Sequence, residues 1–268
     1  MPIDPQLPPW LAAFTPAQMV VASGVLVRMA VAVWAGAMPL AAGTGFRVLA
    51  AVAVVLAVAA TPAALAASPT PVVDGSSILG LLFGEALVGL GMGLAAAAVF
   101  ASASWAGHLL GSVTGLSWAD DFGDGPGTES AGVGRLAWWL GLAGFVAAGG
   151  HESLVAGLVD AVRSLPVGAI ATAIARDGLL ELVATMPSVG LSLAMSLALP
   201  ALAAVLACHL VAAIAVRSVG FDPGQGLLQA VASLVLLAAV CGGTDCWIGG
   251  FAAAVQPPLE RCFHDILP

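Results

Sequence analysis

The chain has 268 residues, of which 60% are apolar and only 8% are charged, and its formal net charge at pH 7 is −8. A soluble domain carries roughly a quarter charged residues, so this composition excludes an ordinary water-soluble fold and indicates helices that face lipid or one another. All seven basic residues are arginines, and so small a number excludes nucleic-acid binding.

Long apolar segments follow one another along the chain, and a bilayer-spanning helix needs about 20 such residues. The predicted apolar helices cover about residues 17–40, 48–67, 78–110, 136–150, 190–216 and 227–255. Between them, residues 151–168 carry leucines and valines three or four positions apart, which predicts one amphipathic helix. We therefore expect an all-α fold of five or six long apolar helices plus this amphipathic helix.

The same segments predict a single membrane domain over residues 1–268. A short N-terminal segment (1–15) precedes helices within about 17–110, an acidic loop covers 115–130, further helices reach about 256, and residues 257–268 form a tail. Positive charge does not orient these helices, because three loop arginines would lie on each side of a membrane. Such a balance indicates helices that are held by partner subunits and not arranged independently in lipid.

Glycines recur at four-residue spacing within one region of the chain. The rows are Gly80/Gly84, Gly89/Gly93 and Gly107/Gly111/Gly115. In an apolar environment such rows let helix backbones approach closely, although a chain rich in glycine and alanine also produces them by chance. Three rows before one loop favour a packing surface, with Gly89, Gly93, Gly107 and Gly111 as its candidate residues.

Arg28 and Glu85 are lone charges inside apolar segments. A charge in the middle of a membrane helix costs about 2.5–3.5 kcal/mol on insertion scales and usually faces a partner or a polar cavity. We expect the two side chains to pair, either with each other or with charges on another subunit. The alternative is that each lies near a helix end and reaches water. If the pair is intramolecular, exchanging the two residues should be tolerated.

The motifs that suggest enzymes are incomplete. "HESLV" begins like the zinc-protease motif H-E-x-x-H, but Val155 occupies the position of the second histidine. Ser117 in "GLSWA" lacks the preceding strand of a hydrolase elbow, which leaves an intramembrane serine protease using Ser117 with His151 or His209 as a remote alternative. The four cysteines lack the spacing of a zinc set. We therefore predict a protein that is not an enzyme and needs no cofactor or metal.

An acidic, glycine-rich loop follows the third glycine row. Its unpaired backbone groups would be unsatisfied in lipid, so at membrane depth it must line water or be buried in protein. It is either a solvated surface loop or a movable loop lying across an aqueous passage. The candidate residues are Gly115, Leu116, Ser117, Trp118, Ala119, Asp120, Asp121, Phe122, Gly123 and Asp124.

The order of these features resembles the FliR/SctT family of type III export-apparatus proteins. The likeness is carried by Arg28 before Pro39 and Arg47, by "GEALVGLGMGL" (84–94), "AGHLLGSVTGLSWADDF" (106–122) and "GGHESLVAGLVDAVRSLPVG" (149–168), and by Pro200 before Arg217. It covers about residues 20–250 and depends on the ordered set. "GLSWA" is more similar to the flagellar branch than to the injectisome branch, whereas "SVGFDPGQG" and "GDGPGTES" depart from the family pattern.

The resemblance implies a multi-pass protein of the bacterial inner membrane, in the flagellar basal body. It implies assembly with FliP-like and FliQ-like subunits and an FlhB-like switch protein into a gate that passes unfolded exported proteins. It also implies that the loop beginning with Gly115–Ala119 and continuing through Asp120–Gly127 plugs the channel. The main rival is a small-solute transporter or channel, acting alone or as a homo-oligomer, with Arg28 and Glu85 lining its site; within the family, the alternative is an injectisome component.

Overall fold

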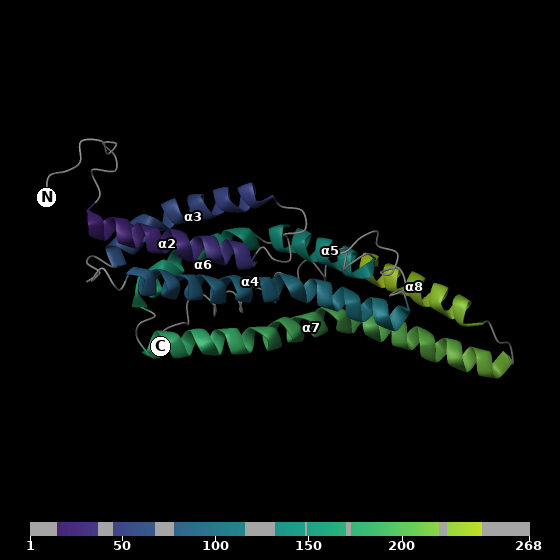
Figure 1. Ribbon diagram of the computed structural model, residues 1–268. Helices are drawn as coiled ribbons and strands as arrows, with labels where there is room; N and C mark the ends of the chain where they lie inside the picture. The colour runs from purple at the N-terminus through teal and green to yellow at the C-terminus, as the bar shows by residue number, and fades with distance from the viewer. Residues whose placement is uncertain are drawn as a thin grey trace. The chain divides into compact units, whose positions relative to one another are not determined.

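The computed structural model describes residues 15–36, 45–67, 78–115, 132–147, 149–169, 173–219 and 224–242. Within these ranges the chain forms seven helices and no strand (Figure 1). They are α2 (Pro16–Gly36), α3 (Phe46–Ala67), α4 (Ile78–Thr114), α5 (Val133–Ala147), α6 (Gly150–Ser164), α7 (Ala173–Val219) and α8 (Gly224–Gly242). The predicted all-α fold, with five or six apolar helices and one amphipathic helix, is confirmed over the described residues.

Four helices are long and apolar enough to cross a membrane. They are α2, α3, α4 and the part of α7 from Val183 to Ser218. α5 and α6 meet the same criterion only as a pair interrupted next to Gly149, and the apolar helix at Gly226–Gly242 is shorter. By length and composition the described residues therefore contain four candidate membrane spans, or five if the interrupted pair counts as one.

α2 begins at a reciprocal capping contact. The backbone N–H of Thr15 donates to Oε1 of Gln18 at 2.9 Å, and the N–H of Gln18 donates to Oγ1 of Thr15 at 3.3 Å. The two side chains thereby satisfy N–H groups that lack helical partners, and Pro16 at the first helical position needs no partner. This polar cap marks one end of an otherwise apolar helix.

α6 is the amphipathic helix that the sequence predicted. It buries Leu158 and Val162, while the predicted stripe residue Leu154 is half-buried. The helix ends at Ser164 and does not continue to residue 168. Pro166 disfavours helical geometry in the residue before it, and Gly168 has a φ of +88°, which favours glycine.

α7 differs most from its predicted extent. It begins at Ala173, 17 residues before Gly190, and includes both Pro187 and Pro200. The charges in "RDGLLEL" obscured the apolar pattern there. Each proline removes a backbone hydrogen bond and crowds the preceding turn, yet the helix continues through both. α8 was predicted to reach about residue 255; the described helix ends at Gly242, and the remainder lies outside the described residues.

The chain divides into two compact units. Unit 1 is drawn from Met1–Ala97, Leu154–Thr185 and Leu259–Pro268, and unit 2 from Ala98–Ser153 and Met186–Pro258. The fully buried side chains of unit 1 include Val21, Val25, Met29, Val88 and Met92, and those of unit 2 include Val99, Leu110 and Leu236. In unit 2, Phe100 of α4 and Phe145 of α5 pack edge to face with their ring centroids 4.9 Å apart.

Candidate functional site

In unit 1, α2 and α4 cross with their backbones in contact at Gly89 and Gly93. A Cβ atom added at Gly89 would collide with the carbonyl oxygen of Arg28. One added at Gly93 would lie 2.6 Å from both the carbonyl oxygen of Ala32 and the Cβ of Ala35. The four-residue spacing of the glycines matches that of Arg28 and Ala32, so α4 presents bare backbone to α2 over a full turn.

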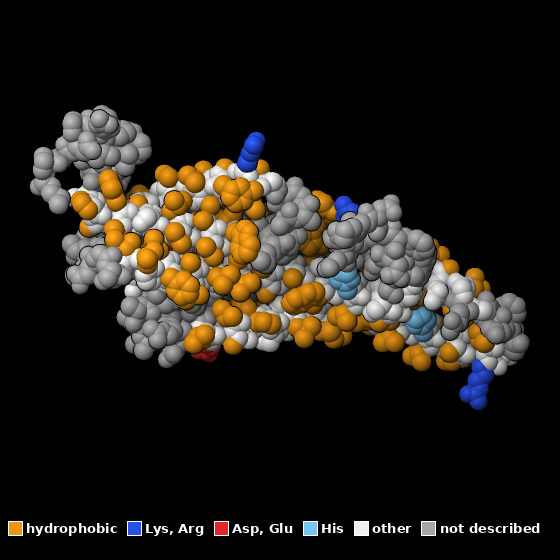
Figure 2. Space-filling view, viewed as in Figure 1, with side chains coloured by type: hydrophobic (Ala, Val, Ile, Leu, Met, Phe, Trp, Pro, Cys, Tyr) orange, Lys and Arg blue, Asp and Glu red, His pale blue; other side chains and the backbone are white. Residues whose placement is uncertain are grey.

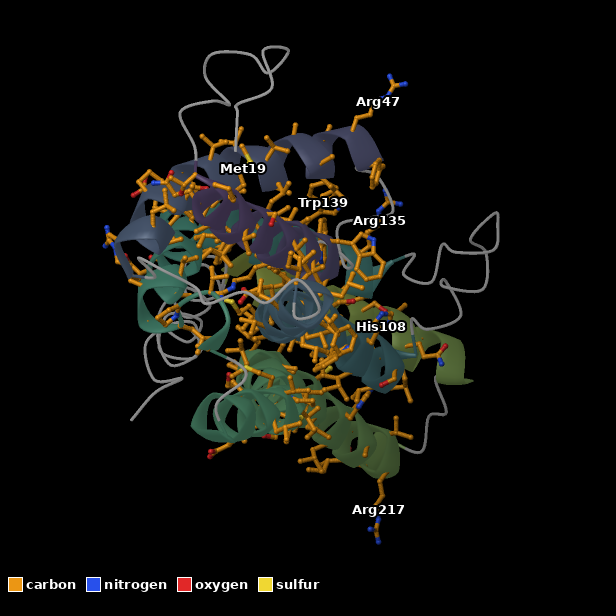
Figure 3. The ribbon with its side chains drawn as sticks, turned by 60° about the vertical axis from the view of Figure 1, so that its left-hand side comes forward. Met19, Arg47, His108, Arg135, Trp139 and Arg217 are labelled. Atoms are coloured by element: carbon orange, nitrogen blue, oxygen red, sulfur yellow. The ribbon has the colours of Figure 1, made fainter. Side chains whose placement is uncertain are left out.

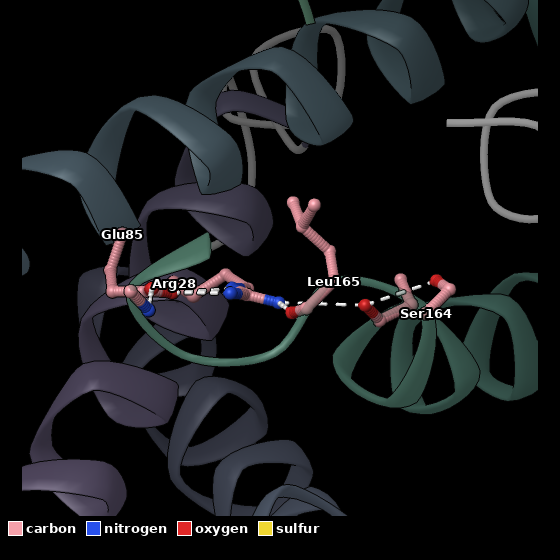
Figure 4. A network of polar contacts seen from close by, with 6 residues as sticks. Arg28, Glu85, Ser164 and Leu165 are labelled. Carbon is pink, nitrogen blue, oxygen red and sulfur yellow. Dashed lines mark hydrogen bonds and ion pairs between the residues drawn. The ribbon is translucent and has the colours of Figure 1, made fainter. Parts of the chain in front are cut away.

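This crossing brings the two lone charges of the apolar segments together (Figure 4). Nε of Arg28 donates to Oε2 of Glu85 at 2.6 Å, and Nη2 lies 2.6 Å from the same oxygen. The side chains are 1% and 0% exposed, respectively. The sequence left open whether Arg28 and Glu85 pair with each other or with charges on another subunit. In the structure they pair with each other.

The C-terminal end of α6 supplies further partners to the pair. Nη1 of Arg28 donates to the carbonyl oxygen of Leu165 at 2.7 Å and reaches that of Ala161 at 3.5 Å. The backbone N–H of Gly168 donates to Oε1 of Glu85 at 2.8 Å. Carbonyl groups at a helix C-terminus attract a cation, so the pair joins α2, α4 and the end of α6 in one buried network.

The local sequence around the network provides the space that it needs. Gly168, with its positive φ, turns its N–H toward Glu85 just after Pro166. On α2, one turn before Arg28, Gly24 is buried, and a Cβ there would lie 2.9 Å from Cγ1 of Val167. A larger residue at Gly24 would require the side chain of Val167 to move, and one at Gly168 would be strained by the positive φ.

The network is suited to holding helices together and not to binding a solute. Both oxygens of Glu85 are engaged, and Arg28 uses Nε and Nη1 in hydrogen bonds. Nη2 makes the ion-pair contact but no hydrogen bond. A solute could reach these groups only by displacing partners that are already buried, so this geometry does not support a transporter in which Arg28 and Glu85 line the binding site.

In unit 2 the third glycine row packs unevenly. A Cβ at Gly107 would lie 2.6 Å from the Cβ of Ala137 and 2.7 Å from the Cα of Gly134, so α4 and α5 touch here through their backbones. At Gly111 the nearest atom would be the Cβ of Val133 at 3.7 Å, which is ordinary van der Waals contact. Gly80, in the first row and in unit 1, makes no close contact, because nothing lies within 4 Å of a Cβ added there.

Gly115 ends α4 in a left-handed conformation with a φ of +71°. This is the usual geometry of a glycine that follows a helix C-terminus. A Cβ there would lie 2.7 Å from Nε2 of Gln229 on α8. The remaining residues predicted for the acidic loop, from Leu116 to Asp124, lie outside the described residues.

Of the three histidines in the described ranges, His108 packs against α5, His151 is exposed and His209 is half-buried. The ring of His108 lies against Gly134, where an added Cβ would be 3.0 Å from its Cε1. Nε2 of His151 lies 4.0 Å from Oε1 of Glu152, and both side chains are exposed. Among the described residues there is no group of three or more His, Cys, Asp or Glu side chains that could hold a metal.

Several residues of these contacts were not singled out from the sequence. They are Ala161 and Gly168 around the buried pair, and Gly134 and Gln229 in unit 2. "SLPVG" carries the signal of a helix end followed by a turn. Nothing in the sequence shows that backbone groups of this turn meet a charge more than 80 residues away.

The sequence model of one protein family, described as bacterial export proteins, family 1, matches residues 19–220, which are 202 of the 268 residues. No curated protein matches the chain.

Proposed function

We propose that this chain, which belongs to family 1 of the bacterial export proteins, the FliR/SctT family, is a subunit of a flagellar protein export gate. Members of this family are non-enzymatic, multi-pass membrane components of the type III export apparatus. The finer assignment to a flagellar gate is supported by "GLSWA" at residues 115–119, which is similar to the flagellar branch.

The main evidence that this chain assembles with other subunits is the length of α7 and its low burial within the chain. Its apolar part, Val183–Ser218, has 36 residues and is therefore about 54 Å long at 1.5 Å per residue. The hydrocarbon core is only about 30 Å thick, so containing a straight helix of this length would need a tilt of about 56°, beyond the usual range of 0–40°. In its most apolar 18-residue window only 11% is buried within the chain.

The part of an apolar helix that extends beyond the hydrocarbon core would expose apolar surface to water, which is unfavourable. Such a part must therefore be covered by protein. We therefore assign FliP-like and FliQ-like subunits as the partners that cover α7, and an FlhB-like switch protein as a protein that docks on the assembly. Unfolded exported proteins would pass through the channel enclosed by these subunits. The backbone contacts at Gly89, Gly93 and Gly107 support rigid packing of the chain within such an assembly.

Co-purification and complementation test this function. We expect the tagged chain, expressed with FliP-like and FliQ-like proteins of the same genome, to purify as one hetero-oligomer, and its gene to restore flagellar filaments in a strain lacking its own copy. Restored filaments would support the flagellar branch, whereas restored injectisome secretion without filaments would favour the other branch. A monodisperse homo-oligomer that transports a solute and retains neither partner would contradict the proposal.

We further infer that the loop after α4 plugs the channel, with Gly115–Asp124 as its principal residues. Support comes from the acidic, glycine-rich sequence, which is unsuited to lipid, and from the cap at Gly115, which ends α4 next to Gln229.

Deletion of Asp120–Gly127 is expected to make cells permeable to small ions or dyes while export continues, because the channel would lose its closure but not its walls. Uptake of a membrane-impermeant dye and the amount of exported flagellar protein measure the two effects. A matched replacement of the same eight residues by a Gly-Ser linker separates the loss of specific residues from the loss of chain length. A deletion mutant that neither leaks nor exports would contradict a plug.

A further inference from the structure

We propose that the charged face of α6, which carries Asp160 and Arg163, lines the water-filled channel of the export gate at the level of the middle of α2. The inference rests on the proposed function, because it needs an assembled gate, and it adds a surface that exported chains pass. It follows from the place where the end of α6 meets α2 and from the partners that the two charged side chains lack there.

The end of α6 lies against the middle of α2, within unit 1. The 21 residues of α2 have their midpoint between Gly24 and Arg28. Nη1 of Arg28 donates to the carbonyl oxygen of Leu165 at 2.7 Å, and a Cβ added at Gly24 would lie 2.9 Å from Cγ1 of Val167. Both contacts place the turn that follows α6 beside the central turns of α2.

This position corresponds to the interior of a membrane. α2 is a candidate membrane span and is about 30 Å long, which equals the thickness of the hydrocarbon core. Gly24 and Arg28 are each about 12 Å from the nearer end of the helix. Asp160 and Arg163 precede Leu165 by five and two residues, a rise of at most about 7.5 Å along α6. Both residues therefore lie at hydrocarbon depth whatever the tilt of α6.

The side chains of Asp160 and Arg163 nevertheless turn outward. They are 43% and 66% exposed, respectively, and Nη1 of Arg163 donates to Oδ1 of Asp160 at 2.8 Å. That hydrogen bond is the only polar contact that either side chain makes with the described residues. The buried pair of Arg28 and Glu85 differs, because a carbonyl oxygen and an N–H group of the turn after α6 complete its bonding. Charges with unfilled donors and acceptors are costly in hydrocarbon, so the outward pair needs water.

The other exposed arginines of the described ranges lie at helix ends that can reach water directly. Arg47 is the second residue of α3, Arg135 is the third of α5, and Arg217 lies in the last turn of α7. Arg47 and Arg217 point away from their helices (Figure 3). Figure 2 shows mainly hydrophobic side chains over the described surface between such ends. Arg163 also lies in the last turn of its helix, but that end meets the middle of α2, so water has to reach inward to it.

A water-filled channel suits this face better than a covering subunit does. An acid and a base three residues apart form the kind of pair found on solvent-facing helix surfaces. A subunit that covered Asp160 and Arg163 would have to supply donors to the carboxylate and acceptors to the guanidinium, whereas water supplies both. A hydrated charged face also offers little apolar surface that could retain an unfolded chain during its passage.

Thiol reactivity tests this assignment in membranes that contain the assembled gate. Native cysteines are replaced, and single cysteines are introduced by Arg163→Cys and by Ala156→Cys, an exposed position of the same face that leaves the charged pair intact. Val55→Cys on α3 is the matched control, because Val55 is 67% exposed within the chain, as Arg163 is, but lies on an apolar helix. Trimethylammonioethyl methanethiosulfonate, which does not cross membranes, is applied to cells and to inverted vesicles. We expect both α6 thiols to react at least about tenfold faster than the Val55 thiol.

An exported protein stalled in the channel distinguishes the channel lining from other wet surfaces. Fusion of the exported protein to a domain that resists unfolding should slow the reaction at both α6 positions several-fold and leave Arg47→Cys, at the outward-pointing start of α3, unchanged. Thiols of α6 that react as slowly as the Val55 thiol in an intact gate would show that protein covers this face. Fast thiols that the stalled chain does not protect would place the face in water outside the channel, and either result overturns the inference. Failure of the proposed function has a different sign, the absence of FliP-like and FliQ-like subunits from the purified complex, and would remove the channel itself.

Discussion

Replacing Arg28 with methionine should lower the free energy of unfolding of the chain by about 3–5 kcal/mol, the usual cost of breaking a buried ion pair. Glu85, which is fully buried, would keep one backbone donor but lose its counter-charge. The carbonyl oxygen of Leu165 would also lose the guanidinium that now donates to it at 2.7 Å. Equilibrium unfolding of the purified chain in mixed micelles measures the change.

Two further variants separate charge from shape. Arg28→Lys keeps the charge but not the fork that contacts Glu85 and Leu165 together, so we expect a smaller loss than for methionine. The double variant Arg28→Met with Glu85→Leu should be more stable than Arg28→Met alone, because no unpaired buried charge remains. Equal stability of Arg28→Met and the parent chain would show that the network contributes nothing measurable.

The network also changes what is expected of a charge exchange. From the sequence, an intramolecular pair should tolerate Arg28→Glu combined with Glu85→Arg. In the structure, a carboxylate at position 28 would face the carbonyl oxygens of Ala161 and Leu165, and a guanidinium at position 85 would face the N–H of Gly168. Both contacts have the wrong polarity, so we now expect the exchange to fail even though the pair is intramolecular.

Gly89→Ala and Gly93→Ala should each destabilise the chain by about 1–3 kcal/mol, the usual cost of overpacking. The added methyl group would meet backbone atoms of α2, including the carbonyl of Arg28, and backbone cannot rotate away as a side chain can. The helices would have to separate, which would also disturb the Arg28–Glu85 contact. Thermal unfolding of each variant, together with its yield in the assembly, reports the effect.

Gly80→Ala is the matched control for these variants. Gly80 lies on the same helix, but nothing lies within 4 Å of an added Cβ. Alanine is favoured over glycine in a helix interior by about 1 kcal/mol, so this substitution should be neutral or slightly stabilising. If Gly89→Ala behaved like Gly80→Ala, the close approach of α2 and α4 would not be a determinant of stability.

Much of the helical architecture could be predicted from local pattern. The run from Phe46 to Ala67 is apolar and uncharged beyond Arg47, and the structure forms α3 over that range. The stripe containing Leu158 and Val162 likewise predicted α6. α7 was shortened in prediction because charged residues near its start and Pro187 resemble breakers, whereas the helix in the structure continues through them.

The glycine rows illustrate the limit of local pattern. Gly80, Gly89 and Gly107 are each followed by another glycine four residues later. A Cβ added at Gly80 would meet nothing, whereas one added at Gly89 would meet the backbone of α2 and one added at Gly107 would meet α5. Which row packs depends on the elements that come to lie opposite, and that is a property of the tertiary arrangement.

The sequence by itself determined that the chain is helical, that its helices avoid water, and that two charges within them need partners, because each of these follows from composition, period and the cost of an isolated charge in an apolar medium. Only the tertiary structure decided that Arg28 and Glu85 meet each other, and that the turn at Leu165–Gly168 completes their hydrogen bonding. The physical reason is that pairing depends on distances between segments far apart in the chain, which the backbone contact at Gly89 and the bend after α6 set together.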